Sequence, residues 1–164
     1  MNCVVIGLGS NIEEPLTQLA GALKHLGAHP DVLPTKLSRI YLSAPVGPQD
    51  QPDFYNAAVV ADTTLTPEAL LQWLLDVEHE MGRQRHRHWG ERCIDLDLLL
   101  FDDLEMQTAS LVVPHPRAHQ RRFVLDPLIE LLGEDHVLPG QGALGALQAK
   151  CADQAIRVLC EFPQ

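Results

Sequence analysis

Apolar and polar residues alternate along the chain in a way that predicts several β-strands within the first hundred positions. The apolar run at 3–8 is typical of a buried strand, and two more strands are predicted at 37–43 and 54–62. The turn-rich segment APVGPQDQPD separates the last two. A fourth strand is predicted around Asp95, where apolar residues continue to Phe101.

Two helices are predicted from apolar residues at helical spacing. The first follows an EEP sequence that ends at Pro15, because acidic residues and proline favour the first turn, and Gly27 is expected to end it. The second begins at Thr66, whose hydroxyl is a suitable N-cap, and Gly82 is expected to stop it.

The order of these elements is strand, helix, strand, strand, helix, strand. This βαββαβ order predicts an α+β fold of the ferredoxin-like kind, with an antiparallel sheet and helices on one face. A short strand at 111–113 and a helix at 126–132 are predicted as C-terminal additions, and residues 139–164 form a weakly patterned tail. With 46% hydrophobic content, we expect one domain spanning residues 1–164.

One predicted strand carries two aspartates in an otherwise apolar run, CIDLDLLLF. Side chains alternate across a strand, so Asp95 and Asp97 share one face while Ile94, Leu96 and Leu98 point to the other. Two carboxylates on one face suit Mg²⁺, which prefers carboxylates completed by water and phosphate oxygens. A polar strand face in contact with solvent explains the same residues, so the pair alone does not decide.

Charge is unevenly distributed along the chain. The net charge of −10 argues against a general binder of nucleic acid or anionic membranes, since both need a broad basic surface. Seven of the twelve basic residues are arginines between positions 83 and 122: Arg83, Arg85, Arg87, Arg92, Arg117, Arg121 and Arg122. Because the planar guanidinium of arginine suits phosphate oxygens, this cluster of arginines indicates either a discrete polyanionic ligand or a solvated basic loop.

The N-terminal residues and the cysteines favour a cytoplasmic protein. The N-terminus lacks a basic region followed by a long apolar stretch, and no apolar run approaches the roughly 20 residues of a membrane span. The four cysteines form no CxxC pair and no zinc spacing, so free thiols in a reducing compartment are expected. We therefore expect a soluble, cytoplasmic protein without a membrane partner.

The motifs of common nucleotide-binding folds are missing. GLGSN at 7–11 lacks the Lys-Ser/Thr pair of a P-loop, and Ile12 breaks GxGxxG, so its glycines are interpreted as a tight turn after the first strand. Aspartates for metal and arginines for phosphate are nevertheless the two parts that phosphoryl transfer requires. His115, between two prolines, is a candidate for a phosphate hydrogen bond. The long connections at 44–53 and 83–93 are candidates to close over a ligand.

Five segments together resemble a known enzyme family. They are GLGSN at 7–11, YLSAPVGPQDQPDFYNAA at 41–58, VEHEMGRQR at 77–85, WGERCIDLDLLLF at 89–101 and VPHPRAHQRRFVLDPL at 113–128. In this order they look like 6-hydroxymethyl-7,8-dihydropterin pyrophosphokinase, over most of the first 132 residues. The resemblance implies a Mg²⁺-dependent transfer of pyrophosphate from ATP to the hydroxymethyl group of a dihydropterin, releasing AMP, in folate biosynthesis.

The resemblance also implies which residues form the site. Asp95 and Asp97 would hold two Mg²⁺ ions, while Arg83 and Arg92 would stabilise the moving charge. The other assignments are Glu78, Arg85, Trp89, Leu98, Val112, His115 and Arg121 for ATP, and Ser43, Ala44, Val46, Phe54, Asn56, Trp89 and Phe123 for the pterin. A flat pterin with donors and acceptors around its rim needs aromatic stacking and an amide. Phe54 and Phe123 offer the stacking, and Asn56 offers the amide.

Two other functions stay open at this point. A Mg²⁺-dependent nucleotidyl- or phosphotransferase that acts on another small alcohol would use the same aspartates and arginines. A non-catalytic RNA-binding module on a ferredoxin-like sheet would need a basic face and exposed aromatic residues, whereas this chain is acidic and only 5% aromatic. For the enzyme, we expect a monomer with small-molecule substrates and no nucleic-acid partner.

Overall fold

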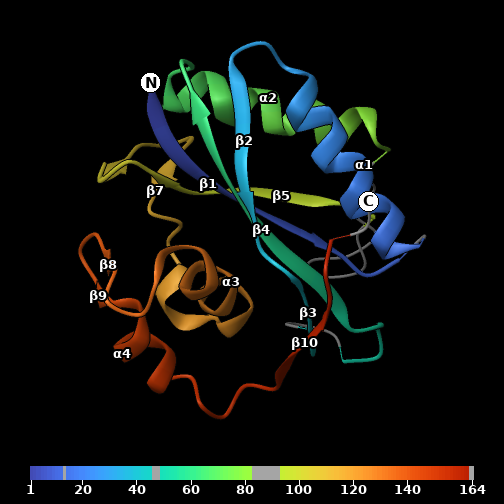
Figure 1. The fold of residues 1–164 in the computed structure, drawn as a ribbon, viewed down its shortest axis with the longest axis vertical. Helices are drawn as coiled ribbons and strands as arrows, with labels where there is room; N and C mark the ends of the chain where they lie inside the picture. The colour runs from blue at the N-terminus through green and yellow to red at the C-terminus, as the bar shows by residue number, and fades with distance from the viewer. Residues whose placement is uncertain (13, 46–48, 83–92, 163–164) are drawn as a thin grey trace.

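The computed structural model of the chain describes residues 1–12, 14–45, 49–82 and 93–162, and its centre is a six-stranded antiparallel sheet (Figure 1). The strands follow the order β10-β3-β4-β1-β5, and β2 also pairs with β4. Their bounds are β1 (Asn2–Ser10), β2 (Val32–Leu37), β3 (Ile40–Ser43), β4 (Phe54–Thr63), β5 (Asp95–Phe101) and β10 (Ile156–Cys160). The strand at the N-terminus therefore lies inside the sheet, between β4 and β5.

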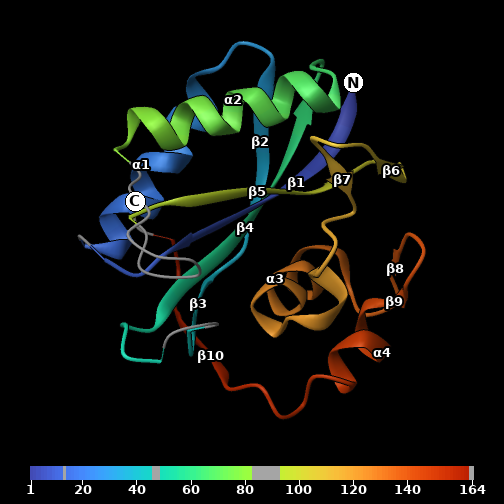
Figure 2. The ribbon, with the colours of Figure 1, turned by 180° about the vertical axis from the view of Figure 1, so that it is seen from behind.

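Two helices cover one face of the sheet, α1 (Pro15–Ala28) and α2 (Pro67–Glu80) (Figure 2). Leu19 of α1 and Leu70 of α2 are fully buried in one cluster with apolar side chains of the sheet. As the sequence predicts, Thr66 caps α2, because its Oγ1 accepts a hydrogen bond of 3.1 Å from a backbone N–H of the first turn.

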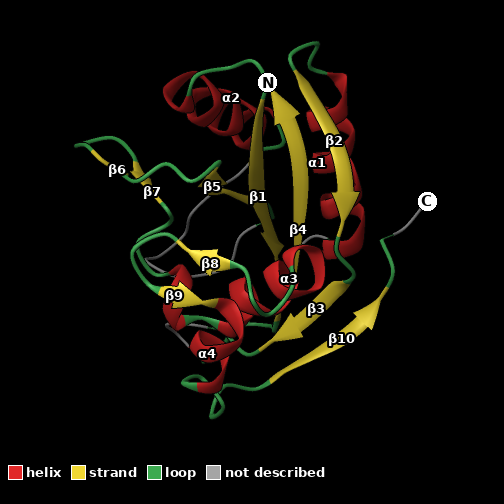
Figure 3. Cartoon of the chain, turned by 60° about the vertical axis from the view of Figure 1, so that its left-hand side comes forward, coloured by secondary structure: helices red, strands yellow, loops and turns green. Residues whose placement is uncertain are grey.

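A second layer of helices covers the opposite face, with α3 (Arg122–Leu132) packed on the sheet and α4 (Leu144–Ala149) beside it (Figure 3). Leu125 and Leu128 of α3 are fully buried in a cluster with sheet residues of this side. Helices α1 and α2 of the predicted βαββαβ order thus share one face, and α3, which follows that order, covers the other. Because both faces are covered, the middle of β4 is a continuous buried run rather than an alternating one.

Proline and glycine mark some helix ends correctly and others incorrectly. The sequence predicts a helix from 126, with Pro127 at its start, but α3 begins at Arg122 and Pro127 lies inside it. Packing against the sheet offsets the backbone hydrogen bond that a proline cannot donate. Helix α1 continues past Gly27 to Ala28, whereas Gly82 follows the end of α2 with a positive φ of 78°, as expected of a stop.

The strand predicted at 37–43 is β3, which begins at Ile40 after an interruption at Ser38 and Arg39. The preceding strand β2, which ends at Leu37, is not among the strands predicted from the sequence. The Oγ of Ser38 accepts a hydrogen bond of 2.8 Å from a backbone N–H of β4. The backbone N–H of Arg39 donates to Oε1 of Glu130 at 3.0 Å, and the hydroxyl of Tyr41 donates to the same oxygen at 2.7 Å. Glu130 belongs to α3, so this helix is tied directly to the interruption.

The described residues of the weakly patterned C-terminal part include short strands and a helix. Strand β7 (Val112–Val113), close to its predicted place, pairs with β6 (Met106–Gln107); β8 (Val137–Leu138) pairs with β9 (Gly142–Ala143), and a short 3₁₀ helix spans Ala118–Gln120. Strand β10 then lies along β3, with Ile156 opposite Ser43 (Figure 3). Within the described ranges, no helix is both long enough and apolar enough to cross a membrane.

Candidate active site

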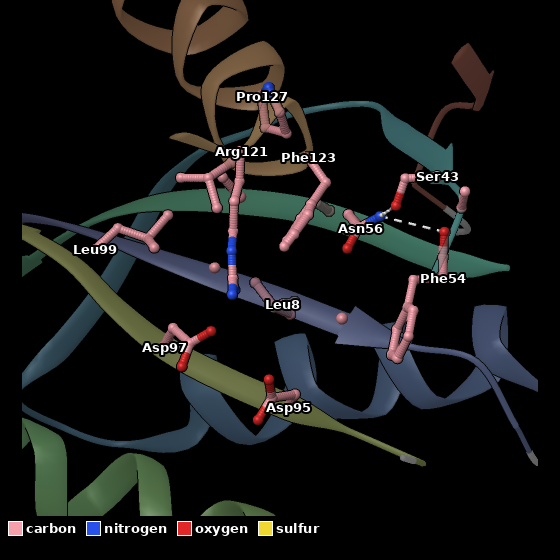
Figure 4. A pocket seen from close by; sticks show the side chains of 16 residues that line it. Leu8, Ser43, Phe54, Asn56, Asp95, Asp97, Leu99, Arg121, Phe123 and Pro127 are labelled. Carbon is pink, nitrogen blue, oxygen red and sulfur yellow. Dashed lines mark hydrogen bonds between the residues drawn. The ribbon is translucent and has the colours of Figure 1, made fainter. Parts of the chain in front are cut away.

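A pocket lies between the sheet and the start of α3 (Figure 4). Strands β1 and β4 form its floor, β5 and the end of β3 form two sides, and α3 covers it. Eight of the predicted site residues line it: Ser43, Ala44, Phe54, Asn56, Asp95, Asp97, Arg121 and Phe123. The structure therefore brings together residues that the sequence analysis assigned to metal, phosphate and pterin.

The side-chain alternation predicted for β5 is confirmed. Asp95 and Asp97 are partly exposed and line the pocket, whereas Ile94, Leu96 and Leu98 are buried in the cluster beneath α1 and α2. Among the described residues, no three His, Cys, Asp or Glu side chains gather around a possible metal position. The donor set at this place is the carboxylate pair, which fits Mg²⁺ because this ion commonly takes its other ligands from water and phosphate.

Two glycines of β1 form part of the pocket floor. Gly9 lies between Asp95 and Asn56 of the neighbouring strands, and Gly7 pairs with Asp97 of β5. A Cβ on Gly7 would lie 3.1 Å from the side chain of Leu99, and one on Gly9 would lie 3.5 Å from Oδ1 of Asn56. The interpretation of these glycines as a turn after the strand is wrong, because both lie inside β1 and keep the floor free of side chains.

The amide of Asn56 is fixed by the strand beside it. Its Nδ2 donates hydrogen bonds to Oγ of Ser43 at 2.8 Å and to the carbonyl oxygen of Phe54 at 3.2 Å. These bonds turn Oδ1 toward the pocket, as Figure 4 shows. The side chain thus offers a preoriented acceptor, with the ring of Phe54 nearby.

Arg121 and Phe123 enter the pocket from the start of α3. The guanidinium carbon of Arg121 lies 5.3 Å from the centre of the Phe123 ring, a cation–π distance. Figure 4 shows the Arg121 side chain pointing from α3 toward the strand that carries Asp97. An arginine and two carboxylates therefore face the same space.

His115 lies close to this charged end. Its backbone N–H donates to the carbonyl oxygen of Leu99 at 3.1 Å, and its Nδ1 accepts a bond of 3.3 Å from the backbone N–H of Arg117. The neutral ring therefore carries its proton on Nε2. Burial lowers the pKa of His115, the charge of Arg121 lowers it further, and the carboxylate of Asp95 acts in the opposite direction.

Four of the residues predicted for ATP do not line this pocket: Glu78, Leu98, Val112 and His115. Glu78 of α2 is buried, and its Oε2 accepts a hydrogen bond of 2.6 Å from the backbone N–H of Leu96. The side chain of Leu98 is buried in the core on the other face of the sheet. Val112 lines a separate cavity beside the β6–β7 hairpin, together with His115.

Five predicted site residues lie outside the described residues: Val46, Arg83, Arg85, Trp89 and Arg92.

The described part of the connection at 44–53 is attached to the end of β1. Nδ2 of Asn11 donates to Oε1 of Gln51 at 2.9 Å and to the carbonyl oxygen of Pro52 at 3.0 Å. This gives the last residue of the GLGSN segment a structural role that the sequence analysis missed.

Two carboxylates and an arginine beside an amide and two aromatic rings form, in an α+β protein, a pocket whose chemistry suits a phosphorylated compound next to a flat polar ring. A family profile described as 7,8-dihydro-6-hydroxymethylpterin-pyrophosphokinase (HPPK) matches residues 5–133. The chain belongs to this family.

Curated relatives agree with the family match. Over 148 residues, the chain is 43% identical to the 2-amino-4-hydroxy-6-hydroxymethyldihydropteridine pyrophosphokinase of Haemophilus influenzae. The alignment covers 90% of this chain and 92% of the relative. Over 161 residues, the chain is 38% identical to the bifunctional protein FolKE of Lactococcus lactis. The alignment covers 98% of this chain but 46% of the relative. The chain thus spans about half the length of this longer relative.

Solved structures share the fold. A Plasmodium falciparum HPPK-DHPS triple mutant with STZ-DHP matches with a TM-score of 0.71 at 15% sequence identity. The match covers 91% of this chain and 43% of the longer one. At this identity the likeness speaks for the fold alone.

Proposed function

We propose that the protein transfers the pyrophosphoryl group of ATP to the hydroxymethyl oxygen of 6-hydroxymethyl-7,8-dihydropterin. The new bond joins this oxygen to the β-phosphorus, and the bond from the β-phosphorus to the bridging oxygen of the α-phosphate breaks. AMP leaves with the bridging oxygen, and the hydroxyl proton passes to water. Membership of the HPPK family supports the reaction. The observation that carries it is one pocket with aromatic and amide groups at one end and charged groups at the other.

The pterin is proposed to bind at the aromatic end. Oδ1 of Asn56 would accept a hydrogen bond from the polar rim of the ring, while Phe54 and Phe123 would contact its flat faces. The end of β3, with Ser43 and Ala44, would border the rim, and Val46 would follow them. Binding of a flat, polar ring here uses the bare floor that the glycines of β1 provide.

The phosphates of ATP are proposed to bind at the charged end. Asp95 and Asp97 would hold two Mg²⁺ ions, which would neutralise phosphate charge when bound. The guanidinium of Arg121 would donate hydrogen bonds to phosphate oxygens, as would the Nε2–H of His115. Most of the catalytic effect would then be positioning and charge neutralisation, as phosphoryl transfer requires.

The remaining assignments are proposed from the family pattern in the sequence. Arg83 and Arg92 are proposed for the transferred charge, and Arg85 for the phosphates of ATP. Trp89 is proposed to contact ATP and the pterin and to close over the site, and Glu78, Leu98 and Val112 are proposed for the adenosine. Glu78 accepts a hydrogen bond from β5 and so supports the strand that carries the aspartates. For Leu98, the backbone is the part proposed to meet the nucleotide, because its side chain is buried.

We also propose that residues 1–164 form a single domain with a ferredoxin-like core. The order of β1, α1, β2 with β3, β4, α2 and β5, together with the sheet order, supports this description. The elements after β5 are then C-terminal additions, of which α3 contributes to the pocket.

Release of AMP tests the proposed reaction. The protein is incubated with ATP and Mg²⁺, with and without 6-hydroxymethyl-7,8-dihydropterin, and the products are identified by mass spectrometry. We expect AMP and a diphosphorylated pterin, formed only when pterin is present. Formation of ADP, or of AMP without dependence on pterin, would contradict the proposal and favour a phosphotransferase that acts on another alcohol.

A further inference from the structure

Gln154 lies between α4 and β10 and makes three hydrogen bonds to Gln120 and Arg122, at the junction of the 3₁₀ helix and α3. Its Oε1 accepts from the backbone N–H of Arg122 at 2.9 Å, and its Nε2 donates to the carbonyl oxygen of Gln120 at 2.8 Å. Its own carbonyl oxygen accepts from Nη1 of Arg122 at 3.3 Å. Arg121, which lines the pocket, is therefore flanked on both sides by residues that Gln154 holds.

The same end of α3 is held a second time through Asp126. Its two carboxylate oxygens accept from Nε and Nη2 of Arg122 at 3.2 and 3.0 Å. Nε2 of Gln148 donates to the same carboxylate at 2.9 Å. The guanidinium of Arg122 is thus engaged with the C-terminal part of the chain, and it does not line the pocket.

The chain from Gln154 leads directly to the opposite wall of the pocket. At Ile156 it enters β10 and pairs with Ser43, the residue of β3 that fixes the amide of Asn56. Residues 148–156, called here the C-terminal strap, therefore join the start of α3 to the end of β3. Both walls of the pocket are attached to this one segment.

We propose that Gln154 is a positioning residue for the reaction. By fixing the residues on either side of Arg121, the C-terminal strap orients Arg121 and Phe123 over the floor of the pocket. The strap lies outside residues 5–133, which the family profile matches, so this role concerns the chain's own C-terminal part. The inference rests on the proposed function in one respect, that Arg121 and Phe123 are the groups that contact the substrates.

Three variants of the 164-residue chain test this role. Gln154→Ala removes both side-chain hydrogen bonds, while Gln154→Glu keeps the acceptor for Arg122 and loses the donor to Gln120. Asp153→Ala, an exposed neighbour, is the matched control. Hydrogen exchange of the peptide at 117–125 reports on the start of α3 without any ligand, and equilibrium binding of the dihydropterin reports on the pocket.

We expect at least about threefold faster exchange and about three- to tenfold weaker pterin binding in Gln154→Ala, with smaller changes in Gln154→Glu and none in Asp153→Ala. Unchanged exchange in Gln154→Ala would overturn the proposal, whatever the ligand does. Faster exchange with unchanged pterin affinity would overturn the positioning role. Faster exchange in a protein whose wild type binds no pterin would instead contradict the proposed function, and leave the attachment of α3 standing.

Discussion

Asp95 and Asp97 occupy the polar face of a strand whose other face is fully apolar. Both carboxylates are partly exposed and line the pocket, so they contribute little to the core. The same holds for the guanidinium of Arg121, which enters from the helix above them. Substitutions at these positions can therefore separate chemistry from folding.

Asp97→Asn keeps the size of the side chain and removes its charge. We expect the free energy of unfolding to change by less than about 0.5 kcal/mol, because the residue is outside the core. We expect kcat to fall at least about a hundredfold, since a charge that stabilises the transition state typically contributes that much. AMP release and a urea unfolding curve measure the two quantities.

The matched control is Asp103→Asn, an exposed aspartate in the turn after β5. It should leave both kcat and stability as they are in the wild type. Full activity in Asp97→Asn would return the aspartates of β5 to the interpretation as a solvated polar face.

His115 makes the stability of the protein depend on pH. Its pKa is lowered in the folded state, so below about pH 6.5 the unfolded chain takes up a proton that the folded protein resists. Stability from this residue is complete above that pH and is lost as the pH falls. We expect the stability difference between wild type and His115→Asn to shrink from pH 7.5 to 5.5, in urea unfolding series. A difference that stays constant would show that His115 does not titrate in this way.

A helix or strand is predicted correctly from the sequence where its cap, its apolar spacing and its stop residue all lie within or beside the segment itself. Helix α2 has its cap at Thr66, its apolar spacing and its stop at Gly82, and β5 has strict alternation around Asp97. The start of α3 is predicted incorrectly because packing on the sheet, a tertiary effect, overrides the usual place of a proline such as Pro127. Strand β10 is missed because none of its residues is buried, so pairing with β3 rather than an apolar pattern defines it.

Strand β1 shows how a small change in an element can affect binding alone. In Gly9→Ala the new methyl group would make only ordinary contact with Asn56, at 3.5 Å, so folding should be unaffected or improved by up to about 1 kcal/mol. The methyl group would stand on the pocket floor, however. We therefore expect the KM for the pterin to rise roughly tenfold, equivalent to about 1.4 kcal/mol. Steady-state kinetics at saturating ATP measure this KM.

A second glycine serves as the control for this prediction. Gly27→Ala lies in α1, far from the pocket, where a Cβ would meet nothing within 4 Å. It should stabilise the protein by about 0.5–1 kcal/mol without changing the KM for the pterin. If Gly9→Ala binds pterin as the wild type does, the floor is not part of the binding site.

For the protein as a unit, the two helical layers share one sheet and should unfold together. Leu128 is fully buried between α3 and the sheet, on the face opposite Trp73 and α2. We expect Leu128→Ala to lower the free energy of unfolding by about 2–5 kcal/mol. In a Trp89→Phe background, the fluorescence of Trp73 and the far-ultraviolet circular dichroism should still give one coincident transition in urea.

The exposed Leu75 of α2 provides the comparison, because Leu75→Ala should change stability by less than about 0.5 kcal/mol. Two separate transitions in Leu128→Ala would mean that the α3 side unfolds independently of the α2 side.

The pocket as a unit could be predicted only in part. Local alternation predicts that Asp95 and Asp97 lie on one face of β5. The family resemblance of five segments adds other residues of the pocket, such as Asn56 and Phe123. The meeting of Gly9, Asn56 and Asp95 depends on the register of three strands, which a single sequence does not reveal. The hydrogen bonds of Gln154 to the start of α3 likewise join positions that no local signal connects.

During synthesis on the ribosome, β3 emerges long before β10, the strand that pairs with its outer edge. Its inner edge can pair with β4 once residues 54–63 are made, but its outer edge has no partner until β10, at 156–160, has left the exit tunnel. During that interval the backbone N–H and C=O groups of this edge are a template on which a strand of another chain can pair. Translation that stalls after α3 would therefore produce an aggregation-prone fragment, in which the protection that β10 gives to this edge is missing.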